Sequence, residues 1–420
     1  MAQVTADQSM ITTVDGIPLK TKLAQAERRN RIKAFSLVLP LLAFVSITFI
    51  FPIAMMIFRS VDNPVVAETL PRTLRELEGW DGTKVPGEEV FAVLAEEMTA
   101  AADARTIGKV ATRLNYDLPG TRSMITGTAR KIRKVEQGPY KEAFIEADEK
   151  WGDPQTWASL KQIGAPYTLS FYLAALDMQY DEDGSIVSQP EDRQIYVPLF
   201  IRTLWVSLLI TVVCVVLAYP ISYLMATLPT AISNLLMIMV LLPFWTSLLV
   251  RTTSWIVLLQ TEGVLNDIAV WLGLIGDENR LQMIYNMNGT VVAMVHILLP
   301  FMVLPLFSVM KTISPSYMRA AKSLGATPAR AFWTVYFPQT VPGIGAGSIL
   351  VFILSIGYYI TPALVGGRTG QLISNFIAFH MQKSLNWGLA AALGGILLAG
   401  VLALYWLYNR VVGIDNMKLG

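Results

Sequence analysis

The chain has 420 residues, of which 53% are hydrophobic and only 15% are charged. A soluble protein of this length needs more charge on its surface, so the composition excludes the soluble globular class and indicates a polytopic membrane protein. The formal net charge of +2 decides little, because 23 of the 31 acidic residues fall between Arg59 and Tyr196. The one cysteine, Cys214, lies in an apolar run, so no disulfide framework exists.

Long uncharged runs predict about six membrane-spanning helices, because a helix needs about 20 apolar residues to cross a bilayer. Residues 34–58 form the first span, and Thr203 to Val250 is long enough for two more, with a turn at Leu228 to Asn234. The other spans are expected in Leu281 to Met310, Gly343 to Val365 and Gly388 to Tyr408. The predicted fold class is an all-α polytopic membrane protein.

Residues 59–197 predict a mainly helical soluble insertion between the first two spans. Gly87 to Asn115 and Lys131 to Ile163 are rich in helix formers at helical spacing, and Asp177 to Asp192 is expected as turn and loop. One interpretation is a cap over the outer loops, and another is a platform whose acids attract a basic solute-binding protein. A catalytic role is disfavoured, because the insertion contains no histidine or cysteine.

Ser247 to Leu259 is apolar but too short to cross alone, so it is interpreted as a continuation of the third span or a re-entrant piece. Arg251 is costly at this depth and needs a partner. Glu262 is expected first and Asp267 is also plausible, backbone carbonyls of a broken helix are an alternative, and snorkelling to the headgroups is the simpler interpretation. His296 and His380 are too far apart in sequence to suggest a metal pair. Aromatic faces can stack on a cationic solute, so a candidate pathway contains Phe244, Trp245, Arg251, Trp255, Glu262, Tyr358 and Tyr359.

The segment Met318 to Ile344 reads MRAAKSLGATPARAFWTVYFPQTVPGI and contains bases but no acid. Ser314-Pro315 and Gly325 predict the two ends of one short helix, and Thr327-Pro328 predicts the start of a second. Pro338 and Pro342 are expected to bend the chain back into the membrane. The simpler alternative is an amphipathic helix that lies on the membrane surface. The apolar face of the first helix contains Tyr317, Ala320, Ala321 and Leu324, and that of the second contains Phe332, Val335 and Tyr336.

Lysine and arginine in short loops mark the cytoplasmic side of a membrane. Six of them lie in residues 1–33, four lie in the loop 311–342 without an acid, and Arg410 and Lys418 follow the last span. Six spans place these segments on one side. Both termini are therefore expected in the cytoplasm, and residues 59–197 outside it. The polar start of the chain is unlike a cleaved signal peptide.

The order of small residues, glycine, phenylalanine and prolines in the basic segment resembles the EAA loop of ABC importer permeases. In that family the loop docks in a cleft of a cytoplasmic ATPase subunit and transmits its closure to the spans. Two positions differ, because Arg319 replaces the usual glutamate and Phe337 replaces a usual leucine. The resemblance implies a set of coupling residues: Tyr317, Arg319, Ala320, Ala321, Leu324, Gly325, Ala326, Phe332 and Pro338.

Leu241 to Asn266, with Gly357 to Gly367, resembles spermidine/putrescine-type permeases, and the resemblance covers the first span and residues from about 199 onward. It implies a type I importer permease fold in the bacterial inner membrane, with a permease core at 198–420. The implied partners are a second permease subunit in a heterodimer, two ATPase subunits, an external solute-binding protein and membrane lipid. The implied solute is a polyamine, or another amine, amino-acid-like or opine-type compound.

The sequence contains no Walker A motif, no glycine-rich phosphate loop and no nucleophile elbow, so this chain is not expected to be an enzyme. ATP and magnesium are expected in the partner ATPases, and neither a cofactor, a metal nor a nucleic acid is expected on this chain. Two alternatives stay open from the residues. An ion-driven secondary transporter would need inverted repeats or broken helices, and a non-transporting scaffold would act through its insertion.

Overall fold

The computed structural model describes residues 19–135, 137–181 and 184–412. Residues 1–18 of the predicted cytoplasmic N-terminal segment, and Lys418 within residues 413–420, lie outside the described residues. The chain divides into two compact units, residues 1–59 and residues 60–420.

The described residues of the first unit form one long helix. It runs as α1 (Leu19–Val45) through a π-helical turn (Ser46–Ile50) into α2 (Phe51–Arg59). Residues Lys22–Arg59 are long and apolar enough to cross a membrane, and they contain the predicted first span. The helix starts before Ala34 because helix-forming polar residues extend it toward the N-terminus.

Four more helices can cross a membrane: α11 (Tyr196–Thr227), α15 (Met287–Thr312), α18 (Phe337–Gly357) with the turn before it, and α21 (Trp387–Val412). The described residues thus contain 5 candidate spans, or up to 6 if a bent pair counts as one. The all-α polytopic class is confirmed. The predicted turn after the second span is shorter than expected, because α11 continues to Thr227 and α12 (Thr230–Leu241) begins at once.

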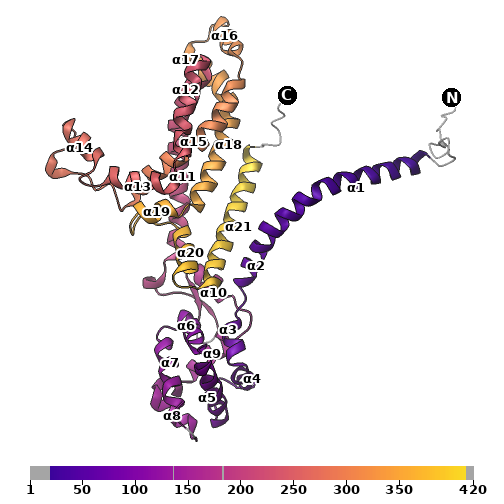
Figure 1. The fold of residues 1–420 in the computed structure, drawn as a ribbon, viewed down its shortest axis with the longest axis vertical. Coiled ribbons are helices and arrows are strands. Elements are labelled where there is room, and N and C mark those ends of the chain that lie inside the picture. Colours follow the sequence, from indigo (N-terminus) through magenta and orange to yellow (C-terminus); the bar gives the residue numbers. More distant parts are fainter. Residues whose placement is uncertain (1–18, 136, 182–183, 413–420) are drawn as a thin grey trace. The chain divides into compact units, whose positions relative to one another are not determined.

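Helices α11, α15 and α18 lie side by side as the core of the second unit (Figure 1). Buried residues recur every four positions along α11, at Val206, Ile210, Cys214 and Ala218, and they share a cluster with α15. Glycine lets α18 approach α15 closely: a Cβ at Gly347 would lie 2.6 Å from the Met302 sulfur. Small residues at such contacts are a common way to pack helices in membranes.

The fifth span begins and ends earlier than predicted. Its predicted second surface helix, α17 (Pro328–Ala331), is not separate but continues through a π-helical turn (Phe332–Tyr336) into α18. Pro338 and Pro342 therefore do not bend the chain, because Pro338 sits in the first turn of α18 and the π-helical turn precedes it.

The span ends at Gly357 rather than Val365, because Pro362 has no N–H for the Tyr358 carbonyl. A short helix, α19 (Ile360–Val365), follows the break. Side chains of α20 (Ile373–Gln382) satisfy the freed carbonyls. Ser374 donates to the Tyr358 carbonyl at 2.6 Å, and Asn375 donates to the Tyr359 carbonyl at 2.7 Å.

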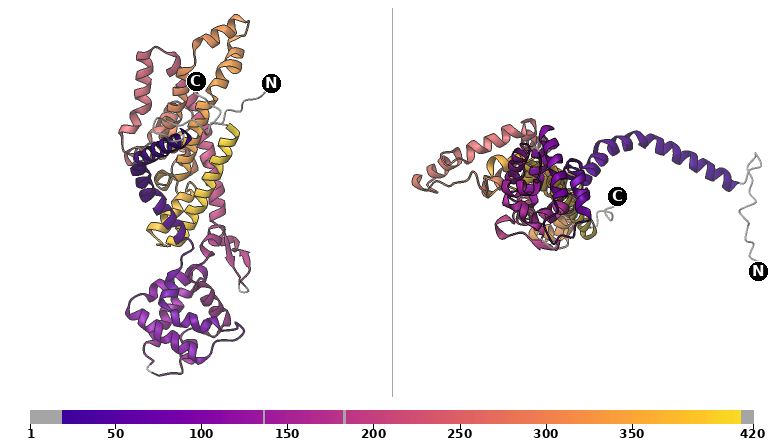
Figure 2. Two further views of the ribbon diagram at one scale, coloured as in Figure 1. Left: turned by 90° about the vertical axis from the view of Figure 1, so that its right-hand side faces the viewer. Right: turned by 90° about the horizontal axis from the view of Figure 1, so that it is seen from below.

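The insertion is helical, as predicted, and its helices gather at the end of the second unit opposite the loop after α15 (Figures 1 and 2). Four buried aromatic residues form the centre of its core, and the rings of Phe91 and Trp157 lie 4.7 Å apart. The region predicted as loop contains a hairpin of β1 (Met178–Tyr180) paired antiparallel with β2 (Ile186–Ser188). The β-branched pair Ile186 and Val187 favours this strand. The helices are α3 (Pro64–Thr69), α4 (Pro71–Glu78), α5 (Glu88–Asp103), α6 (Ile107–Asp117), α7 (Thr121–Ile132), α8 (Tyr140–Ala147), α9 (Pro154–Ile163) and α10 (Ser170–Ala175).

Arg113 joins the entry and exit of the insertion. Its side chain is 4% exposed and donates to Asn63 at 2.7 Å, to Asp117 at 2.9 Å and to Ser170 at 3.1 Å. The guanidinium also lies over the Phe171 ring, 4.7 Å from its centroid. A buried charge is tolerated when it is paired and hydrogen-bonded in this way.

The insertion is fixed to the spans by a carboxylate and by a helix contact. Buried Asp177 accepts hydrogen bonds from the backbone N–H groups of Ile195, Tyr196 and Val197, and so satisfies the start of α11. Helix α10 packs Phe171 against α20 and α21. This contact needs Gly388, because a Cβ there would lie 2.4 Å from the Phe171 ring.

Gly388→Ala should loosen the contact between the insertion and α21. The added methyl group forces the Phe171 ring to move, at a cost of about 1–3 kcal/mol. We expect a lower thermal midpoint of the purified complex and faster proteolysis within residues 64–175. Gly400→Ala in the same helix is the control, because nothing lies within 4 Å of its Cβ position. Equal behaviour of the two variants would contradict the contact.

Candidate functional site

The third apolar segment is broken into two helical halves. Helix α12 passes into a 3-10 turn (Leu242–Trp245), and α13 (Leu248–Leu259) begins after two extended residues. The halves Thr230–Trp245 and Leu248–Trp271 meet at 97°. Pro243 weakens the helix before the break, and the Ser247 hydroxyl accepts a hydrogen bond from the Val250 N–H to start α13. Ser247 to Leu259 is therefore a separate half-helix, and both a broken span and a re-entrant piece remain compatible with the 97° bend.

Helix α13 carries two of the predicted pathway residues, Arg251 and Trp255, one helical turn apart. The Trp255 Nε1–H donates to His296 Nδ1 of α15 at 3.0 Å, and the two rings meet edge to face at 5.3 Å. The charge of Arg251 acts electrostatically on His296 and on Tyr358, which follows α18. The hydroxyls of Thr252 and Thr361 meet at 3.2 Å and hold α13 against α19. We call Arg251, Trp255, His296 and Tyr358 the arginine cluster.

Two histidines have the hydrogen-bonded roles that are usual for buried imidazoles. His296 bonds Trp255, and buried His380 of α20 contacts the Tyr196 hydroxyl at 2.9 Å and the Ser384 hydroxyl at 2.8 Å. Burial lowers the pKa of His380. Among the described residues no group of three His, Cys, Asp or Glu side chains could hold a metal ion.

The prediction that Glu262 or Asp267 holds Arg251 is wrong. Asp267 instead pairs with Arg280 at 2.8 Å, and Asp277 joins the same arginine at 2.8 Å. The hydrogen bonds that Arg280 donates to Asp267, and then those to Asp277, raise the pKa of Arg280. Among the described residues Arg251 makes no ion pair, and its buried Nε has no hydrogen-bond partner.

A buried asparagine explains why the loop after α13 keeps its acids away from Arg251. Asn266 is fully buried and donates to the carbonyls of Gln260, Thr261 and Leu281. The Asn266 side-chain oxygen accepts from the Leu281 N–H. These bonds fold the residues around α14 (Val264–Trp271) into a closed loop of their own.

The remaining predicted pathway residues do not join the arginine cluster. Phe244 packs on Phe301 of α15 with the ring centroids 5.0 Å apart. Trp245 is 75% exposed, and Glu262 and Tyr359 are also exposed. His296 was not in the predicted set, although its position in the middle of an apolar span was the signal that could have placed it there.

The first helix of the basic loop, α16 (Pro315–Ser323), has an open apolar face. Ser314 caps it, and Gly325 follows it with a left-handed φ of +89°, as the sequence predicted. Tyr317 is 52% exposed and Leu324 is 89% exposed, and none of the residues of α16 is buried. Arg319 and Ala320 are exposed as well, and Ala321 is half-buried. Met318 alone among its large apolar side chains packs against the span core, so the helix leaves the side with Tyr317 and Arg319 exposed.

The second half of the loop rests on α11 through aromatic rings. Phe332 meets the rings of Tyr219 and Tyr223 at 6.1 and 6.0 Å, and Tyr336 meets Tyr223 at 5.4 Å. Tyr219 and Tyr223 were not predicted as site residues. Their spacing of four near the end of an otherwise aliphatic run was the available signal.

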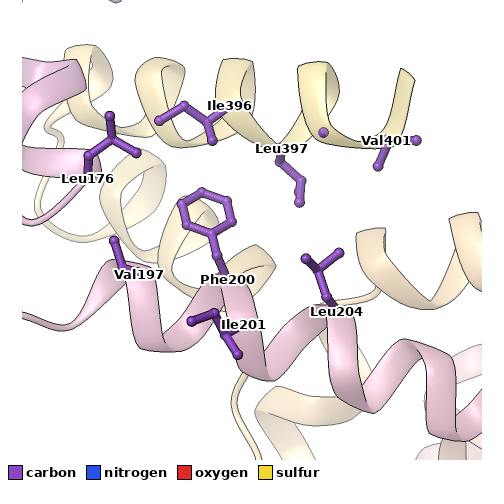
Figure 3. Close-up of a pocket in the computed structure, with 9 residues that line it drawn as sticks. Leu176, Val197, Phe200, Ile201, Leu204, Ile396, Leu397 and Val401 are labelled. Carbon is purple, nitrogen blue, oxygen red and sulfur yellow. The ribbon is translucent and has the colours of Figure 1, made fainter. Parts of the chain in front are cut away.

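One cavity of the fold is lined by apolar residues throughout. It has a volume of about 250 Å³ and lies between α11 and α21, where Figure 3 shows the lining side chains converging. A solute site needs some polar groups to orient its ligand, and this cavity offers none. The lining residues are Leu176, Val197, Phe200, Ile201, Leu204, Ile396, Leu397, Gly400 and Val401.

Comparison with known proteins shows the family. Residues 195–412 match the family described as binding-protein-dependent transport system inner membrane component. The spermidine/putrescine transport system permease protein PotB of Salmonella typhimurium (strain LT2) is 33% identical over 221 residues, which cover 52% of this chain and 76% of that protein. PotB of Escherichia coli (strain K12) is 32% identical, with 52% and 80% covered. A bacterial ABC transporter structure involved in the import of the acidic polysaccharide alginate aligns with a TM-score of 0.42 and 18% identity, over 52% of this chain and 80% of that one.

The chain belongs to the binding-protein-dependent transport system inner membrane components. It is a multi-pass permease subunit of an ABC importer, and it is a membrane subunit rather than an enzyme. The broken helix that an ion-driven transporter would need is present, but family membership decides against that alternative.

Phe332→Ala should uncouple the loop from α11. Loss of the ring contacts with Tyr219 and Tyr223 removes about 2 kcal/mol of packing at this half-buried position. We expect solute uptake to fall at least about fivefold while the subunits still copurify, and Phe332→Leu to retain most of the activity. The measurement is ATP-driven uptake in vesicles. Wild-type uptake by the alanine variant would contradict a transmitting contact.

Proposed function

We propose that the chain is one of two membrane subunits of an ATP-driven importer and translocates a polyamine or a similar small amine. The identity of the solute is supported by the similarity to two spermidine/putrescine permeases, at 33% and 32% identity. The aromatic side chains of Trp255, Phe244 and Phe301 offer faces on which an ammonium group can rest. ATP-driven uptake of spermidine into vesicles that contain the purified complex tests this proposal.

The open face of α16 supports its role as the docking helix for an ATPase subunit. The exposed Tyr317 and Leu324 offer apolar contact, and the exposed Arg319 offers charge. A large apolar side chain in such a position marks a protein contact. The coupling set Tyr317, Arg319, Ala320, Ala321, Leu324, Gly325, Ala326, Phe332 and Pro338 is kept as part of the proposal, with ATP and magnesium bound by the two ATPases.

Movement of α16 has two routes into the spans. One is the helix Pro328–Gly357, which is continuous from the loop to the break before Tyr358. The other is the aromatic contact of Phe332 and Tyr336 with α11. Closure of the ATPases would thus displace the second and fifth spans together and change access to the pathway.

The charge pattern supports the orientation. The loop 311–342 contains four bases and no acid, so it belongs on the cytoplasmic side together with both termini. Residues 59–197 then lie outside the membrane, where 23 acids outnumber 16 bases. This excess of acid supports docking of a solute-binding protein through complementary charge.

Leu324→Asp should prevent capture of the ATPase subunits. The side chain is 89% exposed, so a carboxylate there leaves this chain folded but would be desolvated in an interface. We expect copurified ATPase to fall at least about tenfold. Ile186→Asp is the matched control, because Ile186 is an exposed apolar residue of the β hairpin in the insertion. Undiminished copurification of ATPase with Leu324→Asp would contradict the docking role.

Removal of the helical part of the insertion should weaken capture of the binding protein. The structure offers a clean point of closure, because the Asn63 N–H donates to the Pro166 carbonyl at 2.9 Å. Residues 64–165 can therefore be replaced by a short glycine-serine linker. We expect uptake at low binding-protein concentration to fall and to lose part of its salt sensitivity. Normal uptake under these conditions would leave the insertion as a cap.

A further inference from the structure

The positive charge of Arg251 has no counter-charge among the described residues of this chain. It is the only charged residue between Thr203 and Gln260, and it lies in the first turn of the half-helix α13. A positive charge near a helix N-terminus is disfavoured by the helix dipole, and a charge in the bilayer interior needs a partner. Within the described part of the chain its buried Nε has none.

The spans of this chain contain no carboxylate. The sequence has no Asp or Glu from residue 193 to 261 or from residue 279 to 414. Asp267 and Asp277 bind Arg280, Asp177 caps α11, and exposed Glu262 makes no ion pair with Arg251 among the described residues. The counter-charge for Arg251 must therefore come from another molecule.

A polyamine solute would add further positive charge beside Arg251. This step rests on the proposed function, in which a molecule with several positive charges passes between the spans. A pathway with an unpaired arginine and no carboxylate would repel such a solute. A second copy of this chain would add another Arg251 and again no carboxylate, so two copies cannot form the pathway.

The broken span leaves a surface that another membrane protein can cover. Irregular backbone at membrane depth is tolerated when protein or a water-filled cavity covers it. The residues around the break, Trp245, Leu249 and Val250, are exposed on this chain. The break and Arg251 are four residues apart, so one partner can cover the backbone and supply the charge.

We infer that the second membrane subunit is a different chain that places an Asp or Glu side chain against Arg251. The planar guanidinium can donate two parallel hydrogen bonds to such a carboxylate. The Tyr358 hydroxyl lies within reach of the same charge, and the Trp255 bond to His296 fixes the wall of the site. The two subunits then contribute opposite charges. This chain contributes the Arg251 cation, and the other chain contributes the acids that neutralise it and bind the amine groups of the solute.

Cross-linking of the complex purified through a tag on this chain tests the inference directly. Arg251→Lys introduces an amine, and a membrane-permeant carbodiimide then couples that amine to a touching carboxylate with loss of water. Mass spectrometry of the digested complex should find an amide between position 251 and an acid of a different polytopic chain. Exposed Lys383 is the internal control and should give no such amide in the membrane. An amide to Glu262, or to a second copy of this chain, would overturn the inference, as would none at all.

A charge-removing variant gives a second readout. Arg251→Gln should lower the thermal midpoint of the complex without solute and reduce the second permease that copurifies by about tenfold, whereas Arg251→Lys and Lys383→Gln should resemble wild type. Wild-type assembly and stability with Arg251→Gln would overturn the inference.

The solute itself is another possible source of the carboxylate. Uptake of putrescine and of ornithine, which differ by one carboxylate, tests this source. If Arg251→Gln abolishes uptake of ornithine alone, the solute carries the carboxylate and the inference fails. A wild-type complex that lacks ATPase subunits would instead refute the proposed function, so the two failures can be told apart.

Discussion

Every backbone N–H and C=O inside a bilayer needs a partner within the protein, and this constraint determines where the chain can depart from regular helix. Two departures occur at membrane depth. At the first, Ser247 accepts from the start of α13, and at the second, Ser374 and Asn375 of α20 bond the carbonyls of Tyr358 and Tyr359. Each break is thus stabilised by a polar side chain, and between them these breaks bring α13, α15 and α19 together around Arg251.

The tight contact of α18 with α15 gives the breaks a rigid support. Gly343 and Gly347 remove the side chains that would separate the helices, so a movement of α18 cannot be absorbed by loose packing. The same helix is continuous with the basic loop at one end and meets the α20 side chains at the other. A displacement of the loop therefore reaches the arginine cluster through packed helix rather than through a flexible connection.

The sequence predicted the spans and the caps of α16 well, because both depend on local patterns. Uncharged runs of about 20 residues locate spans, and Ser314, Gly325 and Thr327 have local roles that their residue types define. Charge partners were harder to predict. Glu262 is close to Arg251 in sequence, but the hydrogen bonds of Asn266 fold the loop so that Asp267 meets Arg280. The bend expected at Pro338 also failed, because a π-helical turn accommodates a proline that local rules treat as a helix breaker.

The insertion was predicted as a soluble module between the first two spans, and its contacts attach it directly to the spans of the second unit. Asp177 completes the hydrogen bonding of the first turn of α11, and Phe171 lies against Gly388 of α21 in a cluster that includes Ile373 of α20. Helix α20 in turn holds the end of α18 through Ser374. The insertion contacts α11 directly and contacts α18 through α20. The basic loop contacts α11 and is continuous with α18 at the opposite end of these two helices. The insertion and the basic loop are therefore joined to each other through packed and hydrogen-bonded helices.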